Sequence, residues 1–268
     1  MHILKDLIKN RKLLVYLANN DFKTKYAGSY FGIIWAFIQP VVTILIYWFV
    51  FEKGLKSTPV GNTDIPFVLW LSAGLIPWFF FSEAVINGSN CFIEYSYLVK
   101  KVLFDIKILP IVKILSSLYV HIFFVFILIL MYVFNGLFPG LIILQLLYYS
   151  FCIIMLALSL VYFTSAINIF FKDTMQIINI VMQVGVWLTP IMWNFEDRIG
   201  DFAPWLVFIF KLNPMFYIVD GFRGTMIDHR YFFEHPMWTV YFWGVVLVLL
   251  IFSRFIYFRL KPHFSDVL

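Results

Sequence analysis

The feature that most constrains this chain is a series of long apolar runs that contain no charged side chain. Residues 26–51 lie between Lys25 and Glu52 without an Asp, Glu, Lys or Arg. Residues 114–171 form a longer uncharged run with turn-forming residues near its middle. At ~1.5 Å per helical residue, the first run crosses a ~30 Å hydrocarbon core, and the second is long enough for two crossings. These runs predict an integral membrane protein made of helices.

The same reasoning along the whole chain predicts an all-α fold with six membrane spans in a single transmembrane domain, residues 1–268. We expect the spans to cover residues 26–51, 65–93, 114–134, 141–171, 174–195 and 236–257. Residues 1–25 precede them, and the apolar positions of 2–19 recur at helical spacing beside a basic polar face. This pattern predicts an amphipathic helix that lies in the membrane interface.

The segment between the last two spans, residues 196–234, is unusual for a loop. It contains two apolar pieces, 203–210 and 214–222, which Lys211 and Asn213 separate. Each piece is too short to cross, and backbone at membrane depth must be shielded by protein or water. We therefore expect two short re-entrant or interfacial helices on the outer face.

Lys and Arg are distributed unevenly between the two sides that six spans define. Residues 1–25 carry six, residues 94–113 carry four, and Lys172 with three residues after the last span makes 14 of the 20 in the chain. Cytoplasmic segments of membrane proteins carry an excess of Lys and Arg. The distribution therefore predicts that the N-terminus and the C-terminus both lie in the cytoplasm.

Composition and motifs exclude several classes of function. Hydrophobic residues make up 62% of the chain and charged residues 13%, without one basic face, so nucleic acid is not an expected partner. The sequence has no GxxxxGK[ST] phosphate loop, no HExxH zinc motif and no GxSxG nucleophile elbow. We therefore expect no catalytic residue, no metal site and no cofactor bound by this chain itself.

The first predicted span and its approach carry two groups of candidate residues. Gly28, Gly32 and Ala36 recur at every fourth position, so on one helix they would form a stripe against which a second backbone packs closely. The stripe indicates either a dimer contact or an ordinary membrane helix, in which glycine is common. Lys23 and Lys25 are candidates for binding a lipid headgroup, although anchoring at the interface explains them equally well.

Aromatic residues make up 21% of the chain, and most belong to interfacial belts or lipid-facing packing. A minority is expected to line a conduit, since a transport path must bind its substrate weakly enough to release it. The candidates are Phe31, Trp35, Tyr47, Trp187 and Trp193, together with Glu83, an ionisable residue inside the second predicted span. Glu83 either lines a polar path or pairs with another helix. His121, on an apolar helix, is expected to be a packing or hydrogen-bonding residue.

Residues 94–113 join the second and third predicted spans and alternate basic with apolar positions. A short amphipathic element there, with Lys100, Lys101 and Asp105 exposed, either docks a cytoplasmic partner or lies against anionic lipid.

Motifs along nearly the whole chain resemble one family. They are DFKTKYAGSYFGIIWAFIQP (21–40), GLIPWFFFSEAV (74–85), YLVKKVLFD (97–105), FKDT (171–174), WLTPI (187–191), and NPM with GFRG (213–224). In this order they resemble the membrane subunits of ABC-2 type polysaccharide exporters. The stretches YWFVFEKGL, PVGNT and IPFVLWLSAGLIPWFF are most similar to the wall teichoic acid translocation permeases.

The resemblance implies a homodimer of six-span subunits that works with two copies of a separate ABC ATPase subunit, where ATP and Mg²⁺ bind. It implies that residues 94–105 form a coupling helix seated on the ATPase, with the candidate contacts Tyr97, Leu98, Lys100, Lys101, Phe104 and Asp105. It also implies that the two short outer helices act as a gate and that the first and fifth spans line the conduit.

The expected function is ATP-driven export of a lipid-linked glycopolymer across the bacterial plasma membrane. Wall teichoic acid is the first expectation, and O-antigen or capsular polysaccharide is the alternative within the family. Two other classes are a membrane-embedded lipid-linked glycosyl or phosphoryl transferase and an ion-coupled carrier. A transferase needs clustered acidic residues or a metal, and a carrier needs several ionisable groups inside the membrane.

Overall fold

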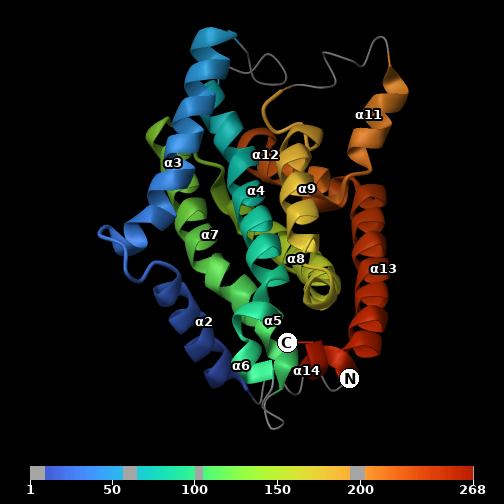
Figure 1. Ribbon diagram of the computed structural model, residues 1–268. Coiled ribbons are helices and arrows are strands. Elements are labelled where there is room, and N and C mark those ends of the chain that lie inside the picture. The colour runs from blue at the N-terminus through green and yellow to red at the C-terminus, as the bar shows by residue number, and fades with distance from the viewer. Residues whose placement is uncertain (1–9, 57–64, 100–104, 194–202, 268) are drawn as a thin grey trace.

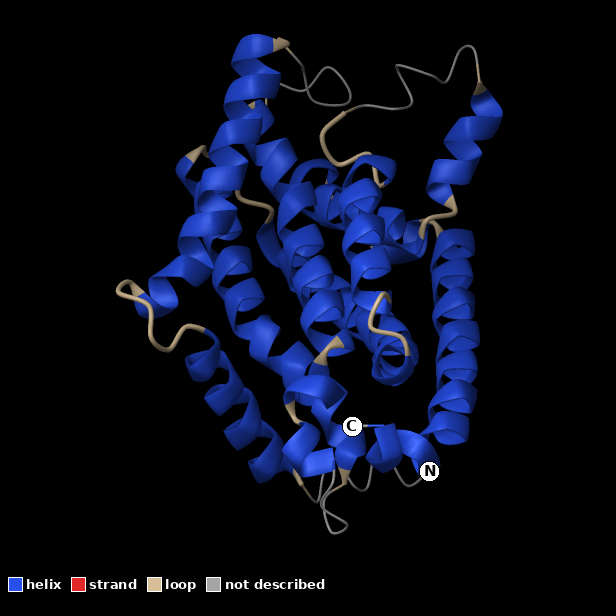
Figure 2. Ribbon diagram, viewed as in Figure 1, coloured by secondary structure: helices blue, strands red, loops and turns tan. Residues whose placement is uncertain are grey.

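The computed structural model describes residues 10–56, 65–99, 105–193 and 203–267, and the regular elements in these ranges are helical, with no strand among them (Figure 2). The long helices run between two ends of the molecule (Figure 1). One end, which we call the α2 end, carries α2 (Arg11–Lys25), α5 (Cys91–Glu94), α6 (Ser96–Val99) and α14 (Phe264–Val267). The opposite end, which we call the α11 end, carries the start of α11 (Pro204–Lys211).

Five helices in the described part of the chain are long and apolar enough to cross a membrane. They are Gly32–Gly54, which contains α3 (Trp35–Trp48), then α4 (Phe67–Ser89), Ile106–Phe134, which contains α7 (Leu109–Phe134), Gly140–Phe170, which contains α8 (Gln145–Phe170), and α13 (Pro236–Leu260). The all-α membrane fold predicted from the uncharged runs is confirmed. Between α9 and α13, α11 and α12 (Pro214–Arg223) are two short helices, and α12 with its continuation to Asp228 is bent by 89° from α11.

The fifth predicted span is shorter than expected. Its helix, α9 (Thr174–Leu188), has 15 residues, which corresponds to about 22 Å. The helix ends where the Thr189 hydroxyl donates a hydrogen bond to the Gly185 carbonyl at 2.7 Å and Pro190 has no amide hydrogen to continue the ladder. Alone, α9 does not reach across a ~30 Å hydrocarbon core.

The first long helix begins later than predicted. The structure also contradicts the prediction that Gly28, Gly32 and Ala36 form a stripe on one helix. Gly28 and Gly32 have φ values of +86° and +53°, in the left-handed region that favours glycine. The chain therefore turns between α2 and Gly32, and Gly28 does not share a helix face with Ala36. Ala36 itself is buried inside the single chain, at 6% exposure.

The third long helix begins earlier than predicted. Residues 94–113 are not one loop, because a 3-10 turn forms at Ile106–Ile108 and α7 begins at Leu109. Lys113 lies inside α7 and is buried, because carboxylates from two other elements balance its charge. At the N-terminus, α2 begins at Arg11, and the first part of the predicted amphipathic helix lies outside the described residues. Its apolar residues Leu14 and Ala18 pack against α7.

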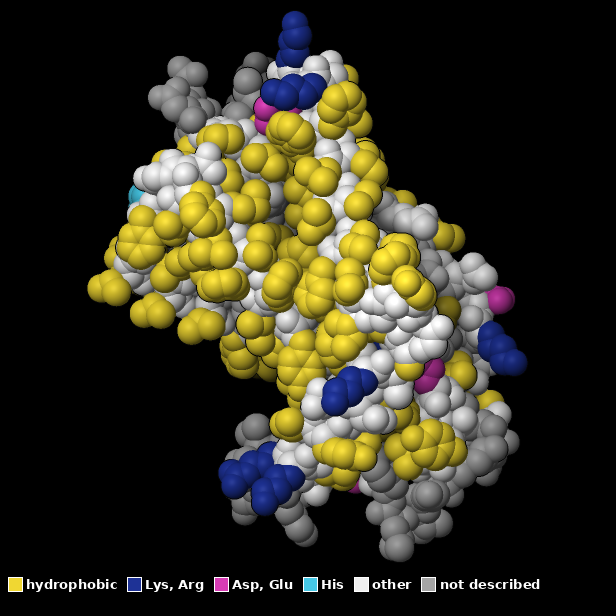
Figure 3. Space-filling view, turned by 90° about the vertical axis from the view of Figure 1, so that its left-hand side faces the viewer, with side chains coloured by type: hydrophobic (Ala, Val, Ile, Leu, Met, Phe, Trp, Pro, Cys, Tyr) yellow, Lys and Arg dark blue, Asp and Glu magenta, His cyan; other side chains and the backbone are white. Residues whose placement is uncertain are grey.

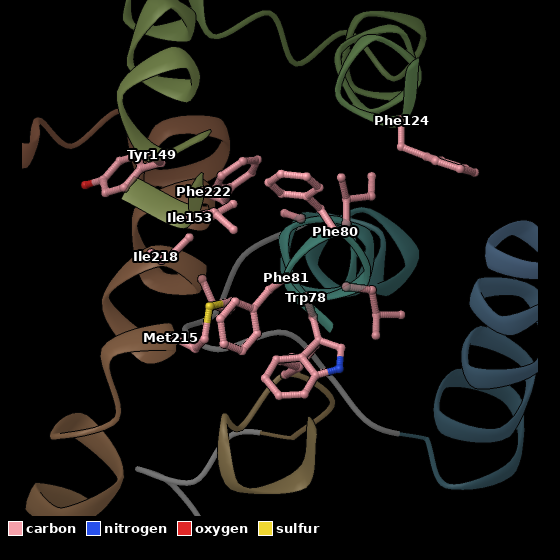
Figure 4. Close-up of a cluster of buried hydrophobic side chains, with 14 of the residues drawn as sticks. Trp78, Phe80, Phe81, Phe124, Tyr149, Ile153, Met215, Ile218 and Phe222 are labelled. Atoms are coloured by element: carbon pink, nitrogen blue, oxygen red, sulfur yellow. The ribbon is translucent and has the colours of Figure 1, made fainter. Parts of the chain in front are cut away.

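Helix α4 is the centre of the core. Of an apolar stretch of 18 residues in α4, 78% are buried. The corresponding share is 11% in the first long helix and 17% in the helix that contains α13. Figure 4 shows its side chains Phe80 and Phe81 beside Phe222 and Met215 of α12. Trp78 points instead toward α9, where its ring lies against Gly185. His121 also belongs to this core, where it stacks on Phe80 at 4.6 Å and shares a hydrogen bond with Ser150. The helices α3, α7, α8, α9 and α12 therefore surround α4, whereas α13 packs on α8. Both α3 and α13 present most of their surface outward.

Candidate functional site

A groove between α2, α3 and α4 brings together residues from three of the predicted groups. Lys25, the last residue of α2, and Glu83 on α4 form an ion pair, with Lys25 Nζ 2.5 Å from the Glu83 carboxylate. The groove has a volume of about 300 Å³ and is also lined by Tyr26, Trp35, Ala36, Gln39, Pro40, Thr43, Phe79, Ser82 and Ile86. We call it the Lys25 groove.

The two opposite charges of the Lys25 groove are partly shielded from solvent. The side chains of Lys25 and Glu83 are 33% and 27% exposed. Burial alone would lower the pKa of Lys25, but the Glu83 carboxylate outweighs it, so this pKa lies above its ordinary value. Lys25 therefore stays charged, and an incoming phosphate would compete with Glu83 for it.

The predicted headgroup residues differ in position. Lys25 lines the groove, whereas Lys23 is exposed on α2 and is not among the groove residues. For Glu83, the structure shows a pair with another helix, and the same side chain lines the Lys25 groove. The pairing interpretation therefore describes this residue, and a polar transport path stays a prediction.

The structure separates the predicted conduit residues into distinct places. Trp35 lines the Lys25 groove, and Phe31 packs edge-on against it with ring centres 5.7 Å apart. Tyr47 lies near the other end of α3. Trp187 lies at the end of α9, where its carbonyl accepts a hydrogen bond from Trp193 Nε1 at 3.2 Å. One copy of the chain does not assemble these rings into a single site.

A second polar centre, which we call the charge cluster, joins three elements at the α2 end. It consists of Asp21 on α2, Glu94 and Tyr95 at the end of α5, and Lys113 on α7. Lys113 Nζ lies 2.6 Å from Asp21 Oδ1 and also contacts the Glu94 carboxylate, and the Tyr95 hydroxyl donates to Asp21 at 2.7 Å. The Lys113 and Asp21 side chains are 8% exposed, so each depends on the other to balance its buried charge.

The charge cluster is a functional candidate that the sequence interpretation missed, because Lys113 was assigned to a loop. One signal was present. Asp21 follows Leu14 and Ala18 at helical spacing, so a carboxylate lies on the apolar face of α2. Such a carboxylate requires a buried cation as its partner. Burial and the hydrogen bond to Asp21 raise the pKa of Tyr95 well above its ordinary value, which keeps its hydroxyl protonated as a donor.

Among the predicted coupling residues, Tyr97 lies beside the charge cluster, with its ring centre 6.2 Å from that of Tyr95. Tyr97 on α6 is exposed. Leu98 is partly buried against a separate apolar cluster at the α2 end, which includes Phe92 and Phe264. The Asp105 carboxylate accepts a hydrogen bond from the Lys107 backbone amide at 3.3 Å and thereby begins the turn before α7. Lys100, Lys101 and Phe104 lie outside the described residues. The short helices α5 and α6 therefore place an exposed ring next to a buried ionic network.

A third arrangement, which we call the α12 anchor, fastens both ends of α12 to the turn that follows α9. At the start of α12, Asn213 Nδ2 donates to the Thr189 hydroxyl at 2.8 Å. At its end, the partly buried Arg223 guanidinium lies 3.5 Å from the ring centre of Trp70 and donates to the Ile191 carbonyl at 2.5 Å. The motifs WLTPI, NPM and GFRG, far apart in the sequence, meet here.

Comparison with known proteins agrees with these motifs. Residues 12–227 match the family described as ABC-2 type transporter. The chain is 25% identical to the O-antigen export system permease protein RfbA of Myxococcus xanthus, with 92% of this chain and 93% of the relative covered. Two proteins of the same description from Klebsiella pneumoniae are 25% and 26% identical, with 96% of this chain and 95% of each relative covered.

The matched segment contains the Lys25 groove, the charge cluster and the α12 anchor. The relatives are bacterial permeases, and the described residues include five helices long enough to cross a membrane. The chain is thus a multi-pass protein of the bacterial plasma membrane and a membrane subunit of a transporter. It belongs to the ABC-2 type transporter family.

Proposed function

We propose that this chain is the permease subunit of an ATP-driven exporter that moves a lipid-linked polysaccharide of the O-antigen kind out of the cytoplasm. The observation that carries the proposal is the similarity, over more than nine tenths of the chain, to three proteins described as O-antigen export permeases. These relatives favour an O-antigen or a related polysaccharide over wall teichoic acid, which the motifs alone favour.

We further propose that two copies form the translocation path between them. Helix α9 exposes an apolar stripe at helical spacing, made of Ile177, Ile180, Val181, Val184 and Leu188. Because α9 is too short to cross lipid alone, its exposed face is best placed against protein. The first long helix is also mostly exposed, and its residue Trp35, with Phe31 just before the helix, would then face the path from both copies.

We propose that the ATPase partner binds at the α2 end. An ABC-2 permease requires an ATPase subunit, and we propose that two copies of it, which bind ATP and Mg²⁺, dock on α5, α6 and the exposed Tyr97. The charge cluster ties α5 to α2 and to α7. Because separating a buried ion pair leaves uncompensated charge, a push on α5 moves all three elements together.

We propose that the lipid pyrophosphate binds in the Lys25 groove. Lys25 is charged there, and Trp35 and Tyr26 provide ring surfaces beside it. The Lys23→Gln, Lys25→Gln double variant tests this assignment. We expect polysaccharide export to fall while insertion in the membrane is unchanged. Unchanged export would remove the headgroup role and leave these lysines as topology anchors.

One experiment distinguishes the proposed function from the other classes. The chain is purified with its bound partners, and the partner with a Walker phosphate loop is then expressed with it in two bacterial strains. One strain lacks its O-antigen exporter and the other its teichoic acid exporter. We expect surface O-antigen to return only when chain and ATPase are both present. Restoration of teichoic acid alone would correct the substrate class.

Export that needs an ion gradient and no ATPase would overturn the proposal in favour of a carrier. A transferase would modify a lipid-linked sugar without partners. In the described part of the chain, no group of three His, Cys, Asp or Glu residues could hold a metal ion for that reaction.

A further inference from the structure

A second cavity lies apart from the Lys25 groove, between α12, α8 and the start of α13. It has a volume of about 300 Å³, at the small end of the range for ligand pockets. Figure 1 places α12 and the start of α13 in the half of the molecule nearer the α11 end. The cavity combines aromatic and charged side chains, among them Tyr149, Tyr217, Phe232, Trp238, Asp220 and Arg230. We call it the Asp220 cavity.

The charges of the Asp220 cavity balance. Arg230 Nη2 lies 3.0 Å from the Asp220 carboxylate and 3.6 Å from that of Asp228. Lys211 also lines the cavity, so the side chains of one Lys and one Arg lie around it together with two carboxylates. The side chains of Asp220 and Arg230 are 43% and 29% exposed, so a solute can reach both. An ion pair of this kind offers hydrogen-bond acceptors and planar N–H donors side by side, without a net positive charge that would attract anions.

The walls of the Asp220 cavity are held in place from behind. The Tyr217 hydroxyl is within hydrogen-bond distance of Thr239 and Tyr148, at 3.0 and 3.1 Å, and its ring stacks on Phe242. The buried amide of Gln145 on α8 fixes the segment after α12. Its Nε2 donates to the Arg230 carbonyl at 3.0 Å, and its Oε1 accepts from the Phe232 amide at 2.8 Å.

We propose that the Asp220 cavity binds an uncharged sugar unit. The inference rests on the proposed function, which brings sugar to the molecule. A sugar ring has apolar C–H faces and a rim of hydroxyls that both donate and accept hydrogen bonds. The half-buried ring of Trp238 matches one of these faces, and the Asp220–Arg230 pair matches neighbouring hydroxyls. A preorganised wall lowers the entropic cost of such binding.

Two other ligand classes match the Asp220 cavity less well. A polyanion such as a glycerol phosphate chain would meet two carboxylates for its two cations. A zwitterionic lipid headgroup fits the balanced charge, and its ammonium can meet an aromatic face, but its charged groups would have to displace the Asp220–Arg230 ion pair, which a neutral sugar leaves intact. The site therefore favours a neutral glycan segment.

Binding is measured by saturation-transfer NMR on the full chain with its ATPase in lipid nanodiscs, without ATP. The probes are maltotriose, mannobiose and the disaccharide of N-acetylglucosamine, with glycerol 3-phosphate and glycerophosphoethanolamine as charged comparisons. We expect at least one saccharide to bind and both charged probes to bind more weakly. Trp238→Ala should weaken saccharide binding about tenfold. Asp220→Asn, which keeps the size of the side chain, should weaken it as well.

The matched control is Trp205→Ala, because Trp205 on α11 is exposed and does not line the cavity. This variant should bind saccharide like the wild type. The proposal is overturned if no saccharide binds, if Asp220→Asn binds it as tightly as the wild type, or if a charged probe binds more tightly. Export is scored separately by surface polysaccharide. No saccharide binding in a chain that exports overturns only the Asp220 cavity assignment, whereas binding in a chain that exports no polysaccharide overturns only the proposed function.

Discussion

Lys113 shows how one buried cation joins helices that the sequence places far apart. Its ammonium group contacts a carboxylate from α2 and another from α5, and a tyrosine hydroxyl donates to the first of these. Removing one member of a buried network costs more than the network itself contributes, because the remaining charge loses its compensation. The charge cluster is therefore the place where single substitutions should affect coupling most.

The first prediction is that Lys113→Met lowers the free energy of unfolding by about 3–5 kcal/mol, because Asp21 stays buried without a cation. The measurement is the thermal unfolding midpoint of the permease–ATPase complex, together with its ATP-dependent export. The matched control is Lys107→Met, since Lys107 pairs with Asp105 at 3.8 Å in a more exposed setting. That change should cost about 1 kcal/mol or less. Equal midpoints for the two variants would refute the buried network.

The second prediction concerns pH at the Lys25 groove. The folded-state pKa of Lys25 is raised above its ordinary 10.5, so the folded chain holds this proton more tightly than the unfolded chain. The contribution of the pair to stability is therefore full below pH 10.5 and is lost as the pH rises further. We expect the difference in unfolding midpoint between wild type and Lys25→Gln to stay constant from about pH 6 to about pH 9. A difference that changes within this range would contradict the assignment.

At the scale of elements, α12 is the part whose position depends most on specific contacts. It lies so close to α8 that a Cβ on Gly221 would be 2.1 Å from the ring of Tyr149. Arg223 holds its end to the chain after α9 and to α4. A shift of α9 in a dimer would therefore carry α12 with it, as expected of a gate.

The third prediction is that Arg223→Lys weakens the α12 anchor although it keeps the charge. An ammonium group has no planar fork with which to reach the Trp70 and Ile191 carbonyls together and stack on the indole. We expect a loss of about 1.5–3 kcal/mol in the free energy of unfolding and a strong loss of export. Arg254→Lys, at an exposed position on α13, serves as the control and should change neither quantity. An Arg223→Lys variant with unchanged stability and export would show that neither depends on the α12 anchor.

The elements were predictable to different degrees, for physical reasons. Long uncharged runs must form helices in lipid whatever their neighbours, so the long helices follow from sequence. Helix ends depend on tertiary contacts, as Lys113 shows, or on backbone conformation, as Gly28 shows. The sequence indicated each of Lys25, Trp35 and Glu83 as a candidate. That they line one groove depends on how α3 and α4 pack, which the sequence does not show. No local pattern relates Lys25 to a partner 58 residues away.

At the scale of the molecule, a single copy leaves a large apolar surface unburied. Figure 3 shows a face with a broad apolar area between basic side chains near its two ends. Lipid can cover the long helices, but α9 is too short to span lipid and exposes a stripe that includes Val181 and Val184. The proposed homodimer resolves this by placing the α9 stripe at the seam.

The fourth prediction tests that seam with single cysteines. The two native cysteines, Cys91 and Cys152, are buried and should not react. Val184→Cys lies on the α9 stripe, whereas Val248→Cys lies on an exposed face of α13, with 48% and 64% exposure in one copy. With a short bifunctional maleimide in native membranes, we expect Val184→Cys to give a covalent dimer and Val248→Cys to stay monomeric, because only the seam brings the same residue of two copies close together. Crosslinking through α13 instead of α9 would move the seam, and with it the translocation path, to the α13 face of the bundle.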